Sequence, residues 1–482
     1  MKVRRILLGL LFAVALVPAY SRPAVSQDGE DKFGLFFKAM DEIQDRYVDE
    51  GKVGTDRLME KAEEGIVDSL DPESMIIREK GASGTAEVGL SVGIRDGGAW
   101  VLDVVEGSPA ERTGLKIGDQ LLRIDGENAG SRKRPDIENM LKGPLGSTVT
   151  LMWANRDREY FEAAVKRDAV VRPALRRFGV DGTEVVQVFR LDAAAVLDIR
   201  RMLGEVDGAL LDLRRASGGD PDAALDLAGA CYATGELLAL GKGSDPVKVR
   251  QYVAEKKKQA VKARLVVLSG WGTCGAPELL VSALKEHRRA VVVGSKTFGA
   301  VSRQKNFALN GRTLRLTVER FLSASNVSLS VTGVGADLGV EEKVESEAVR
   351  FMAKHGFPER LAERIIATPP SAFDADALKT GELRLGRAAA KDKSVAEQKY
   401  EFEQSFVVAA NTLVRELDLD VKSDEVDIDR SWLISETRKA IAKKLMKPDA
   451  FLVAEAREDP VIALGADVLR SLPKLEVRYE EK

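Results

Sequence analysis

Few residues of this chain could perform covalent or metal chemistry. The 482-residue sequence has two histidines, His287 and His355, and two cysteines, Cys231 and Cys274. Two histidines argue against a histidine-based metal site and against a Ser-His-Asp triad. No lysine or arginine stands beside Cys274 in sequence to lower the pKa of its thiol, so a small, inert loop residue is the simpler interpretation. We therefore expect no metal site and no cofactor.

The elements that position these residues alternate between strands and helices over residues 169–340. The expected strands are 209–213, 265–268 and 290–293, and the expected helices are 221–232 and 277–287. Because strands and helices alternate, a layered α/β core is predicted. The two cysteines are too few for a disulfide framework and leave room for one bridge.

Three further regions flank this core. Residues 30–80 have apolar residues at helical spacing, so helices are expected there. Residues 84–168 change to short apolar runs separated by glycines, which predicts a compact β module with one short helix. Residues 341–482 are charged and helical in pattern. The fold class is therefore expected to be mixed α/β with several domains. The formal charge of −3, without a concentrated basic stripe, argues against a nucleic-acid partner.

The first 26 residues, 1–26, have the pattern of a secretory signal peptide. Three basic residues precede an apolar run over residues 6–17, and Ala19-Tyr20-Ser21 offers small residues at the spacing that signal peptidase recognises. An anchor helix is the alternative, but the run is shorter than the roughly 20 residues that a membrane span needs. We expect cleavage and export to the periplasm or another extracytoplasmic space, with no membrane span in the mature chain.

The module at residues 84–168 resembles a PDZ domain of the bacterial protease type. The resemblance rests on three segments in the family's order, Val88-Gly89-Leu90-Ser91-Val92, Gly107-Ser108-Pro109-Ala110 and 118–126. It implies that the loop from Val88 to Ser91 binds the carboxylate of a peptide or protein C-terminus. The adjoining strand edge through Val92 then accepts the peptide as an extra strand. Ile137 and Leu141, which share one helical face, either line this groove or belong only to the core.

The α/β core resembles the carboxy-terminal processing (tail-specific) serine peptidases in three segments. In the first, Gly218 and Gly219 match a turn whose backbone N–H groups can stabilise an oxyanion, although the same pair suits a tight turn. In the second, the family's nucleophile stands three residues before a helix-starting glutamate, and Glu278 places Gly275 there. In the third, the catalytic lysine follows Thr-Phe-Gly, and here Ala300 follows that triplet.

The resemblance therefore implies a peptide-binding family member without catalysis. Neither Gly275 nor Ala300 has a side chain that could attack a carbonyl or accept a proton. Such a protein would scaffold, sequester or regulate, and an active peptidase relative is a second candidate partner. The alternative is an active serine-type endopeptidase with displaced groups, either Ser269 with Lys296 or Cys274 as the nucleophile. An unrelated structural role is a third hypothesis, and the sequence makes no prediction of oligomeric state.

Overall fold

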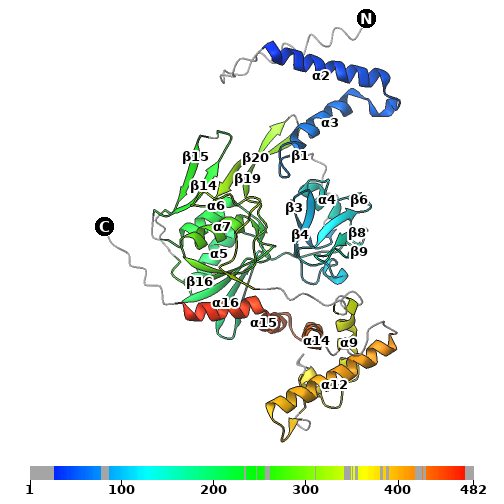
Figure 1. Ribbon diagram of the computed structural model, residues 1–482, viewed down its shortest axis with the longest axis vertical. Helices are drawn as coiled ribbons and strands as arrows, with labels where there is room; N and C mark the ends of the chain where they lie inside the picture. Colours follow the sequence, from blue (N-terminus) through cyan, green and yellow to red (C-terminus); the bar gives the residue numbers. More distant parts are fainter. Residues whose placement is uncertain are drawn as a thin grey trace. The chain divides into compact units, whose positions relative to one another are not determined.

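The computed structural model describes most of the chain. The described residues are 27–77, 86–232, 235–245, 247–255, 261–309, 311–340, 349, 351–352, 356–379, 384–386, 390–417, 426 and 430–472. The predicted signal peptide, 1–26, lies outside them. The chain divides into two compact units, Met1–Asp71 and Pro72–Lys482, and Figure 1 shows their elements.

The first unit contains the helices that were expected from its apolar spacing. They are α2 (Gln27–Arg46), the short η2 (Glu50–Lys52) and α3 (Thr55–Asp68). The Gln44 amide joins the two long helices, because its Nε2 donates to the Val53 carbonyl at 3.1 Å and to the Thr55 hydroxyl at 2.8 Å. These two bonds link the C-terminal part of α2 to the start of α3.

The second unit begins with a β module that has its own hydrophobic core. Its elements are β2 (Ala86–Glu87), β3 (Leu90–Arg95), β4 (Gly98–Val104), η3 (Glu111–Thr113), β5 (Gln120–Ile124), β6 (Glu127–Asn128), α4 (Arg134–Leu141), β7 (Lys142–Gly143), β8 (Thr148–Ala154) and β9 (Tyr160–Lys166). The main sheet has the order β3-β4-β5-β8-β9, with β6 beside β5, and β2 pairs with β7. Short apolar strands separated by positive-φ glycines, such as Gly114 and Gly126, produce this compact arrangement.

A six-stranded sheet forms the centre of the second unit. Its order is β10 (Leu175–Val180), β11 (Thr183–Val188), β12 (Gly208–Asp212), β16 (Arg264–Ser269), β18 (Ala290–Gly294) and β21 (Leu338–Gly339). The strands from β11 to β21 run parallel, and β10 is antiparallel to β11. Continuous apolar runs in β12, β16 and β18 suit this position, because parallel strands are normally covered on both faces.

Alternate side chains of these strands face two different helical layers. Leu211 and Val267 point into the core that contains α5 (Ala193–Gly204), α6 (Pro221–Gly229) and α7 (Ala276–Glu286). Leu210 and Val266 point to the opposite face, which α16 (Pro460–Ser471) covers together with the end of α15 (Pro448–Glu458). The two-residue alternation of a strand thus builds one sheet between two layers of helix, as Figure 1 shows.

A second sheet and a small parallel pair complete the peptidase-like core. The second sheet contains β1 (Met75–Ile77), β20 (Arg312–Leu322), β14 (Leu237–Lys242) and β15 (Val249–Val253) in that order, with β19 (Ser302–Leu309) also paired to β20. The small pair is β13 (Ser217–Gly218) with β17 (Cys274–Gly275). This pair brings two loops of the main sheet together at the candidate site.

The C-terminal region is helical, as its sequence pattern predicted. Helices α9 (Phe357–Ala367), α10 (Ala375–Lys379), α12 (Val395–Glu416) and α14 (Arg430–Leu445) surround a separate hydrophobic core. Phe357, Phe406 and Ile441 are fully buried in it. Helices α15 and α16 belong instead to the central sheet, so the region divides between two cores.

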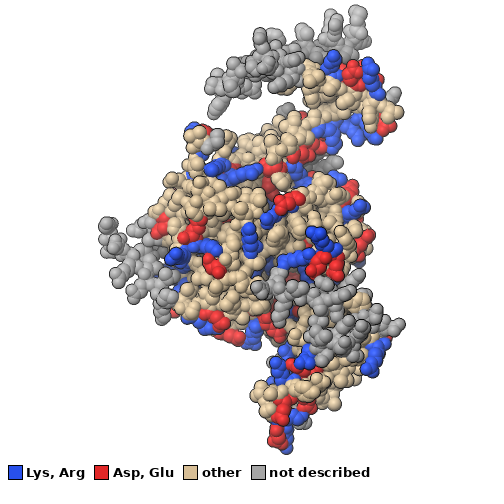
Figure 2. Space-filling view, in the orientation of Figure 1, with Lys and Arg blue, Asp and Glu red and all other residues tan. Residues whose placement is uncertain are grey.

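Charged side chains of both signs are mixed over the face drawn in Figure 2. No helix within the described ranges is long and apolar enough to cross a membrane. The same residues contain no group of three or more His, Cys, Asp or Glu side chains that could hold a metal ion.

Candidate functional site

Three loops at the carboxyl ends of adjacent parallel strands form the candidate site. The loop after β12 leads to Gly218, the loop after β16 leads to Gly275, and the loop after β18 leads to Ala300. Strands β12, β16 and β18 are neighbours in register. Ligand sites in open α/β sheets lie at such carboxyl ends. The topology therefore brings together the three segments that resemble the peptidase family in sequence.

Gly275 lies directly beside the glycine turn. Gly218 and Gly275 are paired in the small parallel bridge, and Gly275 has φ +77° and ψ −127°, a conformation that residues with a side chain rarely adopt. A Cβ on Gly275 would lie 3.3 Å from the Gly218 Cα, whereas one on Gly218 would meet open space. A Cβ on Gly219 would lie 2.2 Å from the Leu191 carbonyl oxygen, so this position requires glycine for packing alone.

The buried carboxylate of Glu278 connects the two positions. Its Oε2 accepts hydrogen bonds from the backbone N–H groups of Gly275 and Ala300, each at 2.9 Å. Its Oε1 accepts from the Thr297 hydroxyl at 2.6 Å and from the Gly299 N–H at 2.5 Å. The side chain is 0% exposed. One carboxylate therefore joins the loop that contains Gly275 to the loop that contains Ala300.

The role of Glu278 at the site was not predicted from the sequence. In the sequence analysis, this residue served only to align the chain with the family and so to locate Gly275. Burial raises the pKa of its carboxyl, although the four donors favour the charged form and oppose that rise. Its position at the third residue of α7, three residues after Gly275, suits a carboxylate that caps a helix N-terminus. The three-residue spacing could have predicted the bond to the Gly275 N–H. The bonds to Thr297, Gly299 and Ala300 could not be predicted, because these residues approach Glu278 only in the folded chain.

Among the described residues, no hydrogen bond joins Ser269 to Lys296, the pair that sequence analysis offered as an alternative nucleophile and base. The Ser269 hydroxyl is 1% exposed and donates to the Ser295 carbonyl at 2.8 Å, whereas the Lys296 side chain is exposed. Burial, and then the charge of Glu278, raise the pKa of the Cys274 thiol well above its usual value. A thiol that stays protonated is a poor nucleophile.

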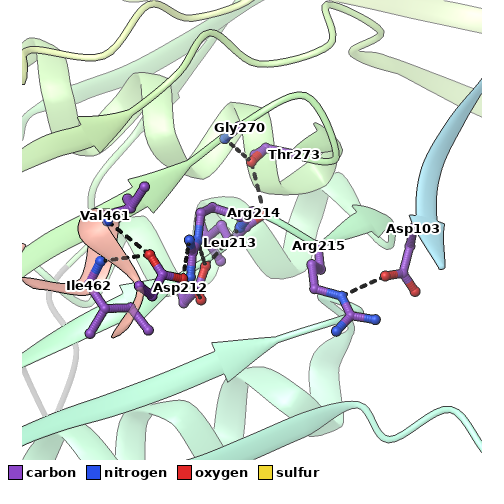
Figure 3. Close-up of polar contacts among 10 residues, drawn as sticks. Asp103, Asp212, Leu213, Arg214, Arg215, Gly270, Thr273, Val461 and Ile462 are labelled. Atoms are coloured by element: carbon purple, nitrogen blue, oxygen red, sulfur yellow. Dashed lines mark hydrogen bonds and ion pairs between the residues drawn. The ribbon is translucent and has the colours of Figure 1, made fainter. Parts of the chain in front are cut away.

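The loop after β12 is held by ionic contacts on both of its sides. Arg214 donates to both carboxylate oxygens of Asp212, at 2.9 and 2.8 Å, and to Asp459 at 2.7 Å. Burial alone would raise the pKa of Asp212, but the Arg214 guanidinium more than offsets it and the pKa is lowered. The Thr273 hydroxyl adds a bond to the Leu213 carbonyl at 2.8 Å. Figure 3 shows Asp212, Leu213, Arg214 and Thr273 at this loop.

Arg215 points the other way and joins the core to the β module. Its Nε donates to the Asp103 carboxylate at 2.7 Å and its Nη2 to the Val104 carbonyl at 2.5 Å, as Figure 3 shows for Asp103. Trp100 of β4 also contacts Trp271 edge-to-face, with ring centroids 5.7 Å apart. The β module thus contacts the loops after β12 and β16, which lead to Gly218 and Gly275.

The predicted peptide-binding loop has the expected turn but buries most of its side chains. Val88, Leu90 and Val92 belong to the core of the β module. Gly89 has φ +89°, and a Cβ there would lie 2.3 Å from the Ser108 Cβ, so the turn needs glycine. Ser91 remains partly accessible.

The two α4 residues that sequence analysis considered for the groove are also buried. Ile137 is 0% and Leu141 is 3% exposed, and both pack in the core of the β module. These positions favour the core interpretation of the pair over groove lining.

Comparisons with known proteins match the same regions. Residues 191–340 match the model of peptidase family S41, and residues 100–155 match that of the PDZ domain. The chain is 24% identical over 334 residues to the carboxy-terminal processing protease CtpA of Bacillus subtilis (strain 168), which covers 65% of this chain and 70% of the relative. It is 27% identical over 309 residues to the carboxy-terminal-processing protease of Bartonella bacilliformis, with coverages of 59% and 70%.

A solved structure shows the same fold. The photosystem II D1 C-terminal processing protease aligns with a TM-score of 0.53 and 22% identity, over 66% of this chain and 94% of that one.

Proposed function

Because this chain belongs to the carboxy-terminal processing peptidase family, with an S41 peptidase domain and a PDZ domain, we propose that it binds peptide or protein C-termini without cleaving them. One observation carries this proposal. The backbones of Gly275 and Ala300 are held on one carboxylate, where the family has its nucleophile and base, and neither residue has a reactive side chain. The framework of the site is kept, and the reacting groups are absent.

The loss of catalysis follows from how a nucleophile and its base act. The two work as a unit, so removing either one costs many orders of magnitude in rate. The groups that could substitute for them are engaged or protonated, since Ser269 donates to a backbone carbonyl and burial raises the pKa of Cys274. No second candidate function is therefore favoured by a specific contact. The protein would hold a peptide tail as a scaffold, or as a regulator of an active relative.

Binding of a C-terminus is tested with one peptide in two forms. A peptide with an apolar, free C-terminus is expected to bind the mature protein in the micromolar range, about −8 kcal/mol. The amidated form should bind at least tenfold more weakly, because amidation removes the charge that the loop from Val88 to Ser91 would accept. Fluorescence anisotropy with a labelled peptide measures both affinities. Equal affinity of the two forms would exclude carboxylate recognition.

Export is proposed from the N-terminal sequence, since residues 1–26 are basic and then apolar. The mature protein is expected to begin before about residue 30 and to occur outside the cytoplasm. Mass spectrometry of the N-terminal peptide in fractionated cells checks both points. An intact Met1 on protein from the cytoplasmic fraction would contradict this proposal.

A further inference from the structure

Arg172, in the segment that connects the PDZ module to the peptidase core, contacts the predicted carboxylate-binding loop. Its Nη2 donates to the Leu90 carbonyl at 2.8 Å, and its Nη1 donates to the Ser91 hydroxyl at 3.0 Å. Its Nε donates to the Glu87 carboxylate at 2.8 Å. Three donors of one guanidinium thus lie along the loop, although Arg172 follows it by more than 80 residues.

The contact with Leu90 lies on the open edge of β3. The Val105 N–H donates to the Gly89 carbonyl at 2.8 Å, and Leu90 is the next residue, paired with Val104 of β4. In an antiparallel pair, hydrogen-bonded and non-hydrogen-bonded positions alternate. Leu90 therefore turns both its N–H and its carbonyl away from β4. This is the edge that a strand-forming peptide would use.

The Arg172 guanidinium occupies the open edge of β3 at Leu90 and places a positive charge there. The guanidinium bound to the Leu90 carbonyl takes the place of a peptide N–H, so a peptide that continues along β3 would have to displace it. A guanidinium has five N–H donors, and its contacts among the described residues leave one N–H of Nη2 without a partner. The guanidinium is bound to the carbonyl of Leu90, so this donor belongs to a group in contact with the residue that supplies the outward N–H. We expect that both N–H groups can donate to one carboxylate.

Two acidic groups keep the guanidinium in place. Glu87 binds its Nε, and Asp103 lies 3.6 Å from Nη1. Asp103 is itself nearer to Arg215 of the core, at 2.7 Å, so its charge is shared between two arginines. The Arg172 side chain is 32% exposed, and a ligand can therefore reach it.

We propose that Arg172 is a binding residue for the terminal carboxylate of the peptide, together with the N–H of Leu90. This inference rests on the proposed function, because it assigns a subsite to the same C-terminus. Arg172 makes the groove require a chain end, since it blocks continuation of the strand and supplies the cation that a free carboxylate needs. An internal peptide segment or an amidated peptide would also meet the guanidinium at Leu90, but it has no terminal carboxylate to form a charge-assisted hydrogen bond with it.

The Arg172→Gln variant separates the charge from the hydrogen bond. Glutamine can still donate an N–H toward the Leu90 carbonyl but has no charge. Its affinity for the free-acid peptide is expected to fall about tenfold, while its affinity for the amidated peptide stays unchanged. Arg172→Lys should retain part of the preference for the free acid, because the charge remains. Anisotropy titrations with both peptide forms measure these affinities on the full mature chain.

Arg177→Gln is the matched control. Arg177 is five residues further along and pairs with Glu184 and Glu205, away from the loop, so its substitution should change neither affinity. An equal loss for both peptide forms in Arg172→Gln would assign the residue a merely structural role and overturn the proposal. Tighter binding would do the same, because Arg172 would then act as a competitor of the peptide. Failure of the wild-type protein to prefer the free acid would instead refute the proposed function.

Discussion

Replacement of Glu278 by alanine is expected to lower the free energy of unfolding by about 3 kcal/mol. The carboxylate accepts four hydrogen bonds, three of them from the backbone N–H groups of Gly275, Gly299 and Ala300. Alanine leaves these donors unpaired in a buried place, at about 1–3 kcal/mol for each donor that water does not reach. The raised pKa shows that burial of the charge has its own cost, which limits the net loss. Urea unfolding followed by circular dichroism measures the difference.

Two further variants sharpen this measurement. Glu278→Gln keeps the shape and can still accept bonds through its oxygen, but its amide N–H groups would face two backbone donors, so an intermediate loss of about 2 kcal/mol is expected. Glu286→Ala changes the same residue type at the exposed end of the same helix, where the side chain accepts from Ser325 and from no other described residue. It should alter stability by no more than about 0.5 kcal/mol. Equal effects of Glu278→Ala and Glu286→Ala would show that the carboxylate does not hold the site.

Peptidase activity is expected to appear only when both missing groups are supplied. The wild-type protein should neither cleave casein nor react with a fluorophosphonate probe. Gly275→Ser with Ala300→Lys introduces the nucleophile and its base together, and either change alone should stay at background because the two groups act as a unit. Probe labelling detected by gel fluorescence, together with casein cleavage, measures the gain.

The restored activity should remain far below that of an evolved enzyme, for two reasons. A serine at φ +77° must hold a conformation that costs on the order of 1–3 kcal/mol, and its Cβ would lie 3.3 Å from the Gly218 Cα. In addition, the nearby carboxylate of Glu278 favours a protonated lysine at position 300, which opposes its use as a base. A displacement of about 1 Å can cost about a hundredfold in rate.

Gly275→Ala with Ala300→Lys is the control for this pair of changes. It carries the same backbone strain and the same new cation but has no hydroxyl, so it should stay at background. Labelling of this control would show that the probe reacts elsewhere. If the wild-type protein itself cleaves casein, and Cys274→Ala or Ser269→Ala abolishes the cleavage, the register that places Gly275 and Ala300 at the catalytic positions is wrong.

The elements of the fold could be predicted because their signals are local. The strand-like runs at residues 209–213, 265–268 and 290–293 became β12, β16 and β18 with shifts of one residue, since continuous apolar runs between glycines suit buried parallel strands. The mixed α/β class and the family resemblance, with its PDZ module, are confirmed. The catalytic positions Gly275 and Ala300 remain predictions, fixed by short motifs whose spacing the structure reproduces around Glu278.

The contacts that could not be predicted connect residues far apart in sequence. Arg215 reaches Asp103 across 112 positions, and Arg172 reaches Leu90 across 82. Neither arginine stands out in sequence, because its partners come from another module and charged residues are common throughout the chain. The burial of Ile137 and Leu141 was also undecided, since a shared helical face does not say whether it meets a groove or a core.

The position of α16 on the central sheet has a consequence for the order of folding. This helix covers Leu210, Val266 and Val293 of the sheet. Arg214 also pairs with Asp459, the residue that caps the N-terminus of α16. The sheet residues are synthesised more than 160 positions before the helix, which at about 5–20 residues per second is a delay of roughly 10–30 s. Through that interval α16 is not available to cover this face of the sheet. The peptidase-like core is therefore complete only after α16 has been made, and contacts of such long range make its formation slow.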